Sequence, residues 1–278
     1  MKSLYRILNF SRYTIYVIIV MAILVPLLSP IGIPIKIGRE ARNFYEIIGR
    51  TQPGEVLLLD VHFALAAAVE CMPQVTAIAS QAFDQGLKII LVSMNPEGEP
   101  FAMQALQELG KAGARYGEDV VYLGFVPGDE LAIVSMLSDL HKTVPQDYKG
   151  TRLSDLPLTA KVKSGAEIAI SVPVTSDASA PEYWTRQVKP YPSMKLLMAS
   201  QASLWPKIQP YLATGQIKGA LNGARGAAEY ELLLNKKGAA VASMDATSVA
   251  YLTFIVLVII GNIVHWIEPR AKEKEGIK

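Results

Sequence analysis

Cysteine and histidine are scarce in this chain of 278 residues. Cys71 is the only cysteine, and the three histidines are His62, His141 and His265. A single thiol cannot form a disulfide, or a zinc site built on several cysteines, within one chain. We therefore expect no structural metal site and no cofactor.

Charge is also limited. Lys, Arg, Asp and Glu together make up 19% of the residues, and the formal net charge is +2. A protein that binds nucleic acid usually gathers Lys and Arg on one surface, so we expect no nucleic-acid partner. Hydrophobic residues reach 51%, and much of this share lies in two long apolar runs near the ends of the chain.

These apolar runs cover Ile15–Ile35 and Ser248–Ile267, and neither contains Lys, Arg, Asp or Glu. A helix of about twenty residues crosses roughly 30 Å of hydrocarbon. We expect a transmembrane anchor over residues 1–36, a soluble domain over 37–240, and a transmembrane helix with a basic tail over 241–278. A cleaved signal peptide is the alternative for the first run, which is longer than the usual signal core. Its prolines fit either a kinked helix or an exit loop that starts near Pro30.

Two spans would place both termini on the same side of the bilayer. The Lys and Arg residues near the ends of the runs divide almost evenly between the two sides, so counting them does not decide the orientation. The basic leader, with Lys2, Arg6 and Arg12, favours a cytoplasmic N-terminus. We therefore expect a two-span protein of the cell membrane with an extracytoplasmic domain.

Between the runs, short apolar stretches alternate with stretches of helical periodicity. The stretches predicted to be strands are Glu55–Asp60, Lys88–Met94, Asp119–Val126, Glu167–Val174 and Met194–Ala199. The predicted helices are Ala64–Gln85 (interrupted near Pro73), Pro100–Tyr116, Asp129–Lys142 (capped by its Asp), Ala180–Val188 and most of Leu204–Leu234. Strands that are apolar throughout indicate a parallel sheet covered on both faces. The predicted fold is α/β, a Rossmann-like three-layer sandwich with a mostly parallel sheet. The segment Thr143–Ser164 has no clear period and is interpreted as a functional loop or a contact surface.

Ligands in such sheets bind beyond the carboxyl ends of the strands. The polar residues expected there are Asp60, His62, Ser93, Asn95, Thr175 and Ser176. Asp60 and His62 could be an acid/base pair or half of a metal site. Alternatively, Asp60 could cap the next helix while His62 is partly exposed. The stretch Pro173–Pro181 could hold an anion or be a solvated loop.

No motif of a known catalytic site is present. Ser93 lies in VSMN and not in G-x-S-x-G, so there is no nucleophile elbow. The turn after the first predicted strand, LDVHFALAA, lacks the G-x-G-x-x-G of dinucleotide binding. The phosphate-binding motif G-x-x-x-x-G-K-[ST] is also absent. We therefore favour a protein that is not an enzyme, with Asp60, His62 and Ser93 as the only weak catalytic candidates.

Glycine is concentrated in the segment Pro210–Glu231, where Gly215, Gly219 and Gly223 repeat every four residues and Gly226 follows. Each glycine costs a helix about 1 kcal/mol relative to Ala, and small residues at this spacing would line one helix face for close packing. That packing could be a subunit contact or a contact with the chain's own sheet. Arg225 and Glu229 lie four residues apart and can pair across one turn.

This segment, PYLATGQIKGALNGARGAAEYE, resembles one in a group of prokaryotic membrane-anchored α/β proteins, and Leu153–Leu158 and Val120–Glu130 resemble that group more loosely. The resemblance covers about half of the soluble part. It implies architecture and transfers no chemistry and no catalytic residue.

Three functions are compatible with these features. The first, which we expect, is a non-enzymatic membrane-anchored scaffold that assembles with itself or with other membrane proteins, motivated by the two anchors, the glycine segment, the irregular loop and the absence of a catalytic motif; the other two are alternatives. The second is a sensor that binds a small ligand at the strand ends. The third is a hydrolase centred on Asp60, His62 or Ser93.

Overall fold

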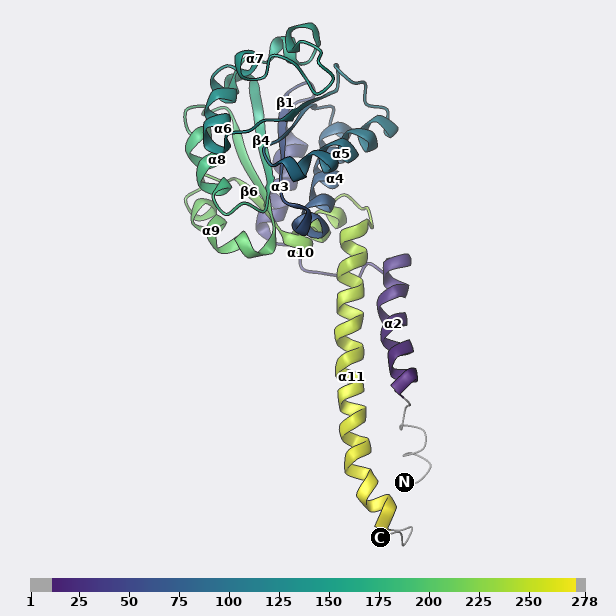
Figure 1. Cartoon of the computed structure of the whole chain (residues 1–278). Helices are drawn as coiled ribbons and strands as arrows, with labels where there is room; N and C mark the ends of the chain where they lie inside the picture. Colours follow the sequence, from purple (N-terminus) through teal and green to yellow (C-terminus); the bar gives the residue numbers. More distant parts are fainter. Residues whose placement is uncertain (1–11, 274–278) are drawn as a thin grey trace. The chain divides into compact units, whose positions relative to one another are not determined.

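The computed structural model describes residues 12–273 of the chain (Figure 1). The chain divides into two compact units. One unit combines the apolar segments from both ends of the chain, Met1–Pro34 and Lys237–Lys278, and the other is the domain Ile35–Lys236.

The domain is built on a parallel sheet of six strands in the order β3-β2-β1-β4-β5-β6. The strands are β1 (Val56–His62), β2 (Lys88–Ser93), β3 (Val120–Phe125), β4 (Ile168–Thr175), β5 (Lys195–Ser200) and β6 (Gly219–Asn222). Every pair of neighbours is parallel. The expectation of an α/β fold with a parallel sheet is confirmed, and the five strands predicted from apolar runs are all present.

Helices cover both faces of this sheet (Figure 1). One face packs against α3 (Arg39–Arg50), α4 (Ala68–Asp84), α5 (Glu99–Lys111) and α10 (Gly223–Leu233). The other packs against α6 (Asp129–Ser138), α8 (Ala180–Val188) and α9 (Trp205–Ala213). Leu57 and Leu59 belong to the first core, whereas Val56 and Leu58 belong to the second. Successive strand residues point to opposite faces, so burial on both sides explains why the strands are apolar throughout.

Two helix details differ from the prediction. The helix α4 continues through Pro73, which lies in its second turn, so the expected interruption is wrong. The cap expected from Asp129 is also wrong, because Gly128 is the N-cap of α6 and no side chain caps it. The predicted helix instead breaks at Asp139, which is extended and whose side chain caps the short helix α7 (Leu140–Thr143).

The irregular segment forms two short 3-10 turns, Leu153–Asp155 and Thr159–Lys161. Its first part is held by the buried carboxylate of Asp147. That carboxylate accepts the backbone N–H groups of Lys149 at 2.9 Å and Thr151 at 2.8 Å, and the hydroxyl of Tyr116 at 2.5 Å. The segment is therefore ordered by specific polar contacts within the chain.

The glycine-rich segment is not one helix, and the prediction that its glycines line one helix face is wrong. Gly215 follows α9 with φ +69°, Gly219 begins β6, Gly223 has φ +56° at the start of α10, and Gly226 lies within α10. A Cβ on Gly219 would lie 2.6 Å from the backbone nitrogen of Phe44, and one on Gly226 would lie 2.8 Å from the carbonyl carbon of Leu221. Gly219 and Gly226 thus allow close packing within the chain, and Gly215 and Gly223 adopt the positive φ that glycine tolerates.

We predict that Gly219→Ala destabilises the domain by about 1–3 kcal/mol, because the added methyl group meets helix backbone that cannot rotate away. Gly110→Ala is the matched control, since Gly110 lies in α5 and a Cβ there meets nothing within 4 Å. That change should stabilise the domain by up to about 1 kcal/mol. Chemical denaturation of the full chain in detergent measures both. Equal effects of the two substitutions would contradict the packing described here.

The apolar unit contains, among the residues described, one helix long and apolar enough to cross a membrane. This stretch is Ala239–Trp266 within α11 (Ala239–Glu273), with a mean hydropathy of 2.2. The first apolar run gives α2 (Arg12–Leu28), whose 17 residues extend only about 26 Å. Within residues 12–273, a full-length first span is not found, and α2 ends at Leu28, before Pro30. Part of the charge pattern used for orientation lies in residues 1–11 and 274–278, outside the described residues.

The two apolar helices lie side by side (Figure 1). A buried acid on α11, Asp245, holds the loop after α2. Asp245 accepts the backbone N–H groups of Gly32 at 2.7 Å and Ile33 at 2.9 Å. The ammonium group of Lys237 donates to the carbonyl of Ile31 at 2.8 Å. The segment from Pro30 is therefore a loop and not the continuation of a kinked helix, which was the other alternative left open by the sequence.

We predict that Asp245→Ala speeds hydrogen exchange at the Gly32 and Ile33 amides by about tenfold or more, because each loses a hydrogen bond to a charged acceptor. Ser248→Ala is the control. It removes a hydroxyl from the same helix that bonds only to the helix's own Met244 carbonyl at 2.8 Å. Exchange mass spectrometry of the full chain in detergent gives the readout, and unchanged exchange in Asp245→Ala would show that the acid does not hold this loop.

Candidate functional site

The winding of the sheet reverses between β1 and β4, which lie side by side although β2 and β3 intervene in sequence. In open α/β sheets, ligands bind at such a reversal, beyond the carboxyl ends of the strands, and this edge between β1 and β4 is called the crevice below. His62 pairs in register with Thr175, Thr175 with Ser200, and Ser200 with Asn222. Register partners share a face of the sheet. These four side chains, called the polar row below, therefore lie along the carboxyl edge on the α6–α8–α9 side.

At the β1 end of the polar row, Asp60 and His62 form a buried pair. One oxygen of Asp60 lies 3.3 Å from Nδ1 of His62, and its other oxygen accepts the backbone N–H of Met94 at 3.2 Å. The far nitrogen of His62, Nε2, lies 3.8 Å from the carboxylate of Asp177. Asp60 thus orients the imidazole from its Nδ1 side, and Asp177 faces it on the Nε2 side.

The electrostatics of the pair favour a protonated imidazole. Burial by itself would lower the pKa of His62, but the carboxylates of Asp60, Asp177 and Asp129 together outweigh it, and the pKa is raised above 6.5. Asp60 makes the largest of the three contributions, through its charge and its hydrogen bond. His62 is therefore not a partly exposed residue beside a capping Asp, as one interpretation of the sequence held.

Ser93 and Asn95 are brought to the same edge but serve the loop after β2. The buried hydroxyl of Ser93 lies 2.9 Å from the carbonyl oxygen of Val61 and 2.8 Å from that of Asn95. The Asn95 side chain accepts the backbone N–H of Glu97 at 2.9 Å. A Cβ on Gly98 would lie 2.2 Å from the Val61 carbonyl oxygen, so this loop packs directly on the end of β1. The contacts of Ser93 are structural and give it no base to activate it.

Side chains of the domain accept three of the backbone N–H groups at this edge. Between β1 and α4, the N–H of Ala64 donates to Ser176 Oγ at 3.1 Å and that of Leu65 to Glu97 Oε2 at 2.7 Å. Between β5 and α9, the N–H of Ala202 donates to Glu70 at 2.9 Å. In many α/β proteins, a phosphate binds to N–H groups at a helix start that have no partner within the chain. The occupation of the three groups above by acids and a hydroxyl of the chain disfavours a phosphorylated ligand.

Acceptor atoms without partners remain along the polar row. In the part of the chain that the structure describes, Ser200 Oγ and Asn222 Oδ1 are buried without a hydrogen bond. Gln74 on α4 donates to the carbonyls of Ser200 at 3.1 Å and Gly223 at 3.0 Å, while its own oxygen has no partner. Buried polar atoms are almost always paired. The Ser200 hydroxyl and the Asn222 amide oxygen are therefore polar atoms of this edge with hydrogen-bonding capacity that the chain leaves unused.

The site places a buried imidazole between two acids, Asp60 and Asp177. Within residues 12–266, whose side chains are described, no group of three or more His, Cys, Asp or Glu is placed to hold a metal ion. Asp60 and His62 have the geometry of the acid–imidazole half of a catalytic triad. The side chain facing Nε2 is an acid, Asp177, and not a nucleophile.

Sequence reasoning missed the acids on the solvent side. Asp177 lies two residues after the end of β4, inside the stretch interpreted as an anion cradle or a solvated loop, and its Oδ1 accepts the N–H of Ser179 at 3.0 Å. Thr175 Oγ1 accepts the N–H of Asp177 at 2.9 Å, so the hydroxyl of Thr175 builds the turn that positions this acid. The signal in the sequence was the acid itself, since Asp177 directly follows Thr175 and Ser176 at the end of a predicted strand.

Arg225 and Glu229 lie on α10 and pair at 2.9 Å, as their spacing predicted. Glu229 also accepts the N–H of Gly38 at 2.9 Å, at the start of α3. These contacts, like those of the glycines, are made within the domain. Any role of this segment between subunits stays a prediction.

Comparisons of the chain with protein-family models, with curated proteins and with solved structures find no match. The function is therefore argued from the geometry of the site.

The protonated His62 should make stability depend on pH. Its pKa in the folded protein is raised above 6.5, so the stability it contributes is fully present below about pH 6.5 and is lost as the pH rises through the folded value. We predict that the melting temperature of the full chain in detergent falls over this range in the wild type, and falls less in His62→Gln. His141→Gln serves as the histidine control, since His141 is a half-buried residue of α7 whose Nε2 lies 2.8 Å from the Thr159 carbonyl oxygen, and this variant should keep the wild-type slope. An identical slope in all three proteins would mean that His62 is not charged in the fold.

Proposed function

We propose that this protein is a membrane-anchored, Rossmann-like module that binds a small ligand carrying hydrogen-bond donors, such as an amine or a guanidinium compound. The ligand would lie in the crevice between the ends of β1 and β4. The observation that carries the proposal is the polar row beside the acids Asp177 and Asp129, in which four polar side chains lie in register along one edge and two of their atoms have no partner. This is the second of the three functions compatible with the sequence.

The charges at the crevice support a cationic ligand. Asp177 uses one oxygen for the Ser179 N–H, and its other oxygen faces His62 at 3.8 Å, which is too long for a hydrogen bond. Asp129, at the start of α6, is exposed and also acts on His62. Two acids on the solvent side can accept from an ammonium or guanidinium group, and a hydrogen bond to a charged group contributes about 1.5–3 kcal/mol.

Proton binding and ligand binding should oppose one another at this site. A protonated His62 supplies a positive charge close to Asp177, in the position that a cationic ligand would use. Loss of that proton leaves the acids without a counter-ion. The affinity for a cation should therefore rise with pH, and bound cation should lower the pKa of His62.

Nucleotide binding and hydrolysis have less support. The N–H groups that would hold a phosphate donate to Ser176, Glu97 and Glu70. Ser93 makes contacts that hold a loop, and Nε2 of His62 faces an acid. A binding module without catalysis, rather than an enzyme, is the interpretation consistent with these contacts.

Membrane anchoring is supported by the exposed apolar surface of the unit that contains α2 and α11. Large apolar side chains exposed on these helices include Tyr13, Leu24, Tyr251, Phe254 and Trp266. Lipid is the environment in which such a surface is stable. We propose that α11 crosses the bilayer with α2 alongside it. A second full span, cytoplasmic termini and an extracytoplasmic domain remain proposals, as does the assembly expected from the sequence.

The ligand proposal is tested with agmatine, a small molecule with an amine and a guanidinium group. We expect agmatine to raise the melting temperature of the full chain in detergent, and to do so more strongly at pH 8.5 than at pH 6. Asp177→Asn should weaken agmatine binding by about tenfold, since it removes the charge that holds one donor group. Adenosine monophosphate and inorganic phosphate, added at equal concentration, should give no shift.

Asp155→Asn provides the matched control, because Asp155 is an exposed acid that pairs with Arg152 on the irregular segment. It should bind agmatine like the wild type. Stabilisation by adenosine monophosphate or phosphate that is lost in Asp177→Asn, or agmatine binding that Asp155→Asn reduces equally, would refute the proposed site.

A further inference from the structure

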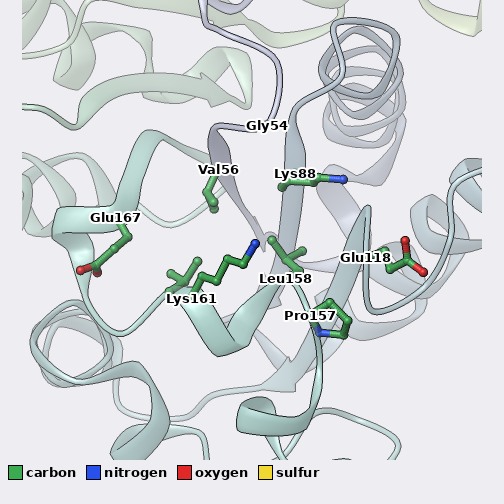
Figure 2. A pocket seen from close by; sticks show the side chains of 9 residues that line it. Gly54, Val56, Lys88, Glu118, Pro157, Leu158, Lys161 and Glu167 are labelled. Atoms are coloured by element: carbon green, nitrogen blue, oxygen red, sulfur yellow. The ribbon is translucent and has the colours of Figure 1, made fainter.

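A second hollow, of about 340 Å³, opens at the amino-terminal end of the sheet, opposite the polar row (Figure 2). Its apolar lining includes Val56 at the start of β1 and Leu158 and Val162 from the irregular segment. Its charged lining includes Lys88 and Lys161. The volume falls within the range of small-molecule sites, and the irregular segment, which had no role in the crevice, forms part of the wall.

Most charges around this hollow are already balanced within the chain. Lys88 pairs with Asp119 at 2.7 Å, and Arg115 pairs with Asp119 at 3.0 Å and with Glu118 at 2.6 Å. The bonds from Arg115 and Lys88 hold the pKa of Asp119 well below its usual range. Two cations and two anions therefore form one neutral group.

The remaining acid is also engaged. Glu167 closes a capping box, in which its carboxylate accepts the backbone N–H of Ser164 at 2.8 Å and the Ser164 hydroxyl at 2.9 Å. These contacts keep its charge on the short turn Gly165–Glu167. Figure 2 shows this carboxylate turned away from Lys161.

Lys161 is thus the unmatched charge of the hollow. Its ammonium group has no hydrogen bond or ion pair within the described residues, and Figure 2 shows the nitrogen directed into the hollow, over the apolar side chains. An unpaired cation above an apolar surface is complementary to an anion with an apolar body.

We propose that this hollow binds a small organic anion, a carboxylate or a phosphate monoester on a short branched apolar group, with the anionic group on Lys161 and the apolar group on Val56, Leu158 and Val162. The site is independent of the crevice between β1 and β4, because it lies at the other ends of the strands and takes the opposite charge.

The test uses a set of probes of one shape and different charge: isovalerate, isopentyl phosphate, isopentanol and isopentylamine. Titration calorimetry of the full chain in detergent should show binding of both anions, with affinities at least fivefold higher than those of the alcohol and the amine. Lys161→Gln should weaken anion binding by about fivefold to tenfold, because it removes the charge from one partly exposed hydrogen bond. Binding of the alcohol should not change.

Lys163→Gln is the matched control, since Lys163 is an exposed lysine on the same segment that does not line the hollow. It should change anion binding by less than twofold, and so should Asp177→Asn at the other edge. The proposal is overturned if neither anion binds, if the alcohol binds as tightly as isovalerate, or if Lys161→Gln binds both anions like the wild type. Failure of agmatine to bind the crevice would leave this site unaffected.

Discussion

The pairing of β1 with β4 is the constraint on which the site depends. It joins two halves of the sheet that wind in opposite directions, and its register sets His62 beside Thr175. The same register, continued through β5 and β6, lines up the polar row at one edge. A shift of one residue would move every side chain of β1 to the other face, and the apolar residues of the two cores make that shift costly. The hydrophobic pattern of the strands therefore fixes where the polar residues meet.

A second theme is the use of the chain's own acids at backbone donors. Glu97 and Glu70 accept N–H groups at the carboxyl edge, Glu229 does so at the start of α3, and Asp245 does so in the apolar unit. A helix start favours a negative charge, and here the protein supplies that charge itself. Two backbone donors at the edge that binds phosphate in many α/β proteins are thereby occupied. The acids Asp177 and Asp129 act on His62 at the same edge, and for this reason we propose a cationic ligand there.

Much of the fold could be predicted because burial leaves a strong pattern. The five longer strands are apolar runs, and Asp60 and His62 stood out as polar residues at the end of one. The strand β6 was missed because its four residues, Gly219–Asn222, contain no β-branched or aromatic side chain and lie among glycines spaced as on a helix face. Close packing on Phe44 and a turn at Gly223 produce the same spacing without a helix. The approach of Asp177 to His62 depends on a turn built by Thr175, and the hold of Asp245 on the Gly32 loop joins residues more than two hundred positions apart. Neither leaves a local signal in sequence.

The claim that the crevice between β1 and β4 is an acidic cation site around His62 is tested most directly by nitrogen-15 NMR of the imidazole in the full chain. The spectrum would be followed during addition of agmatine and, separately, of inorganic phosphate. Over a pH titration, the account predicts that the imidazole has a pKa above 6.5, that agmatine lowers this pKa, and that phosphate leaves it unchanged. A pKa at or below 6.5, or one that responds to phosphate and not to agmatine, would contradict it.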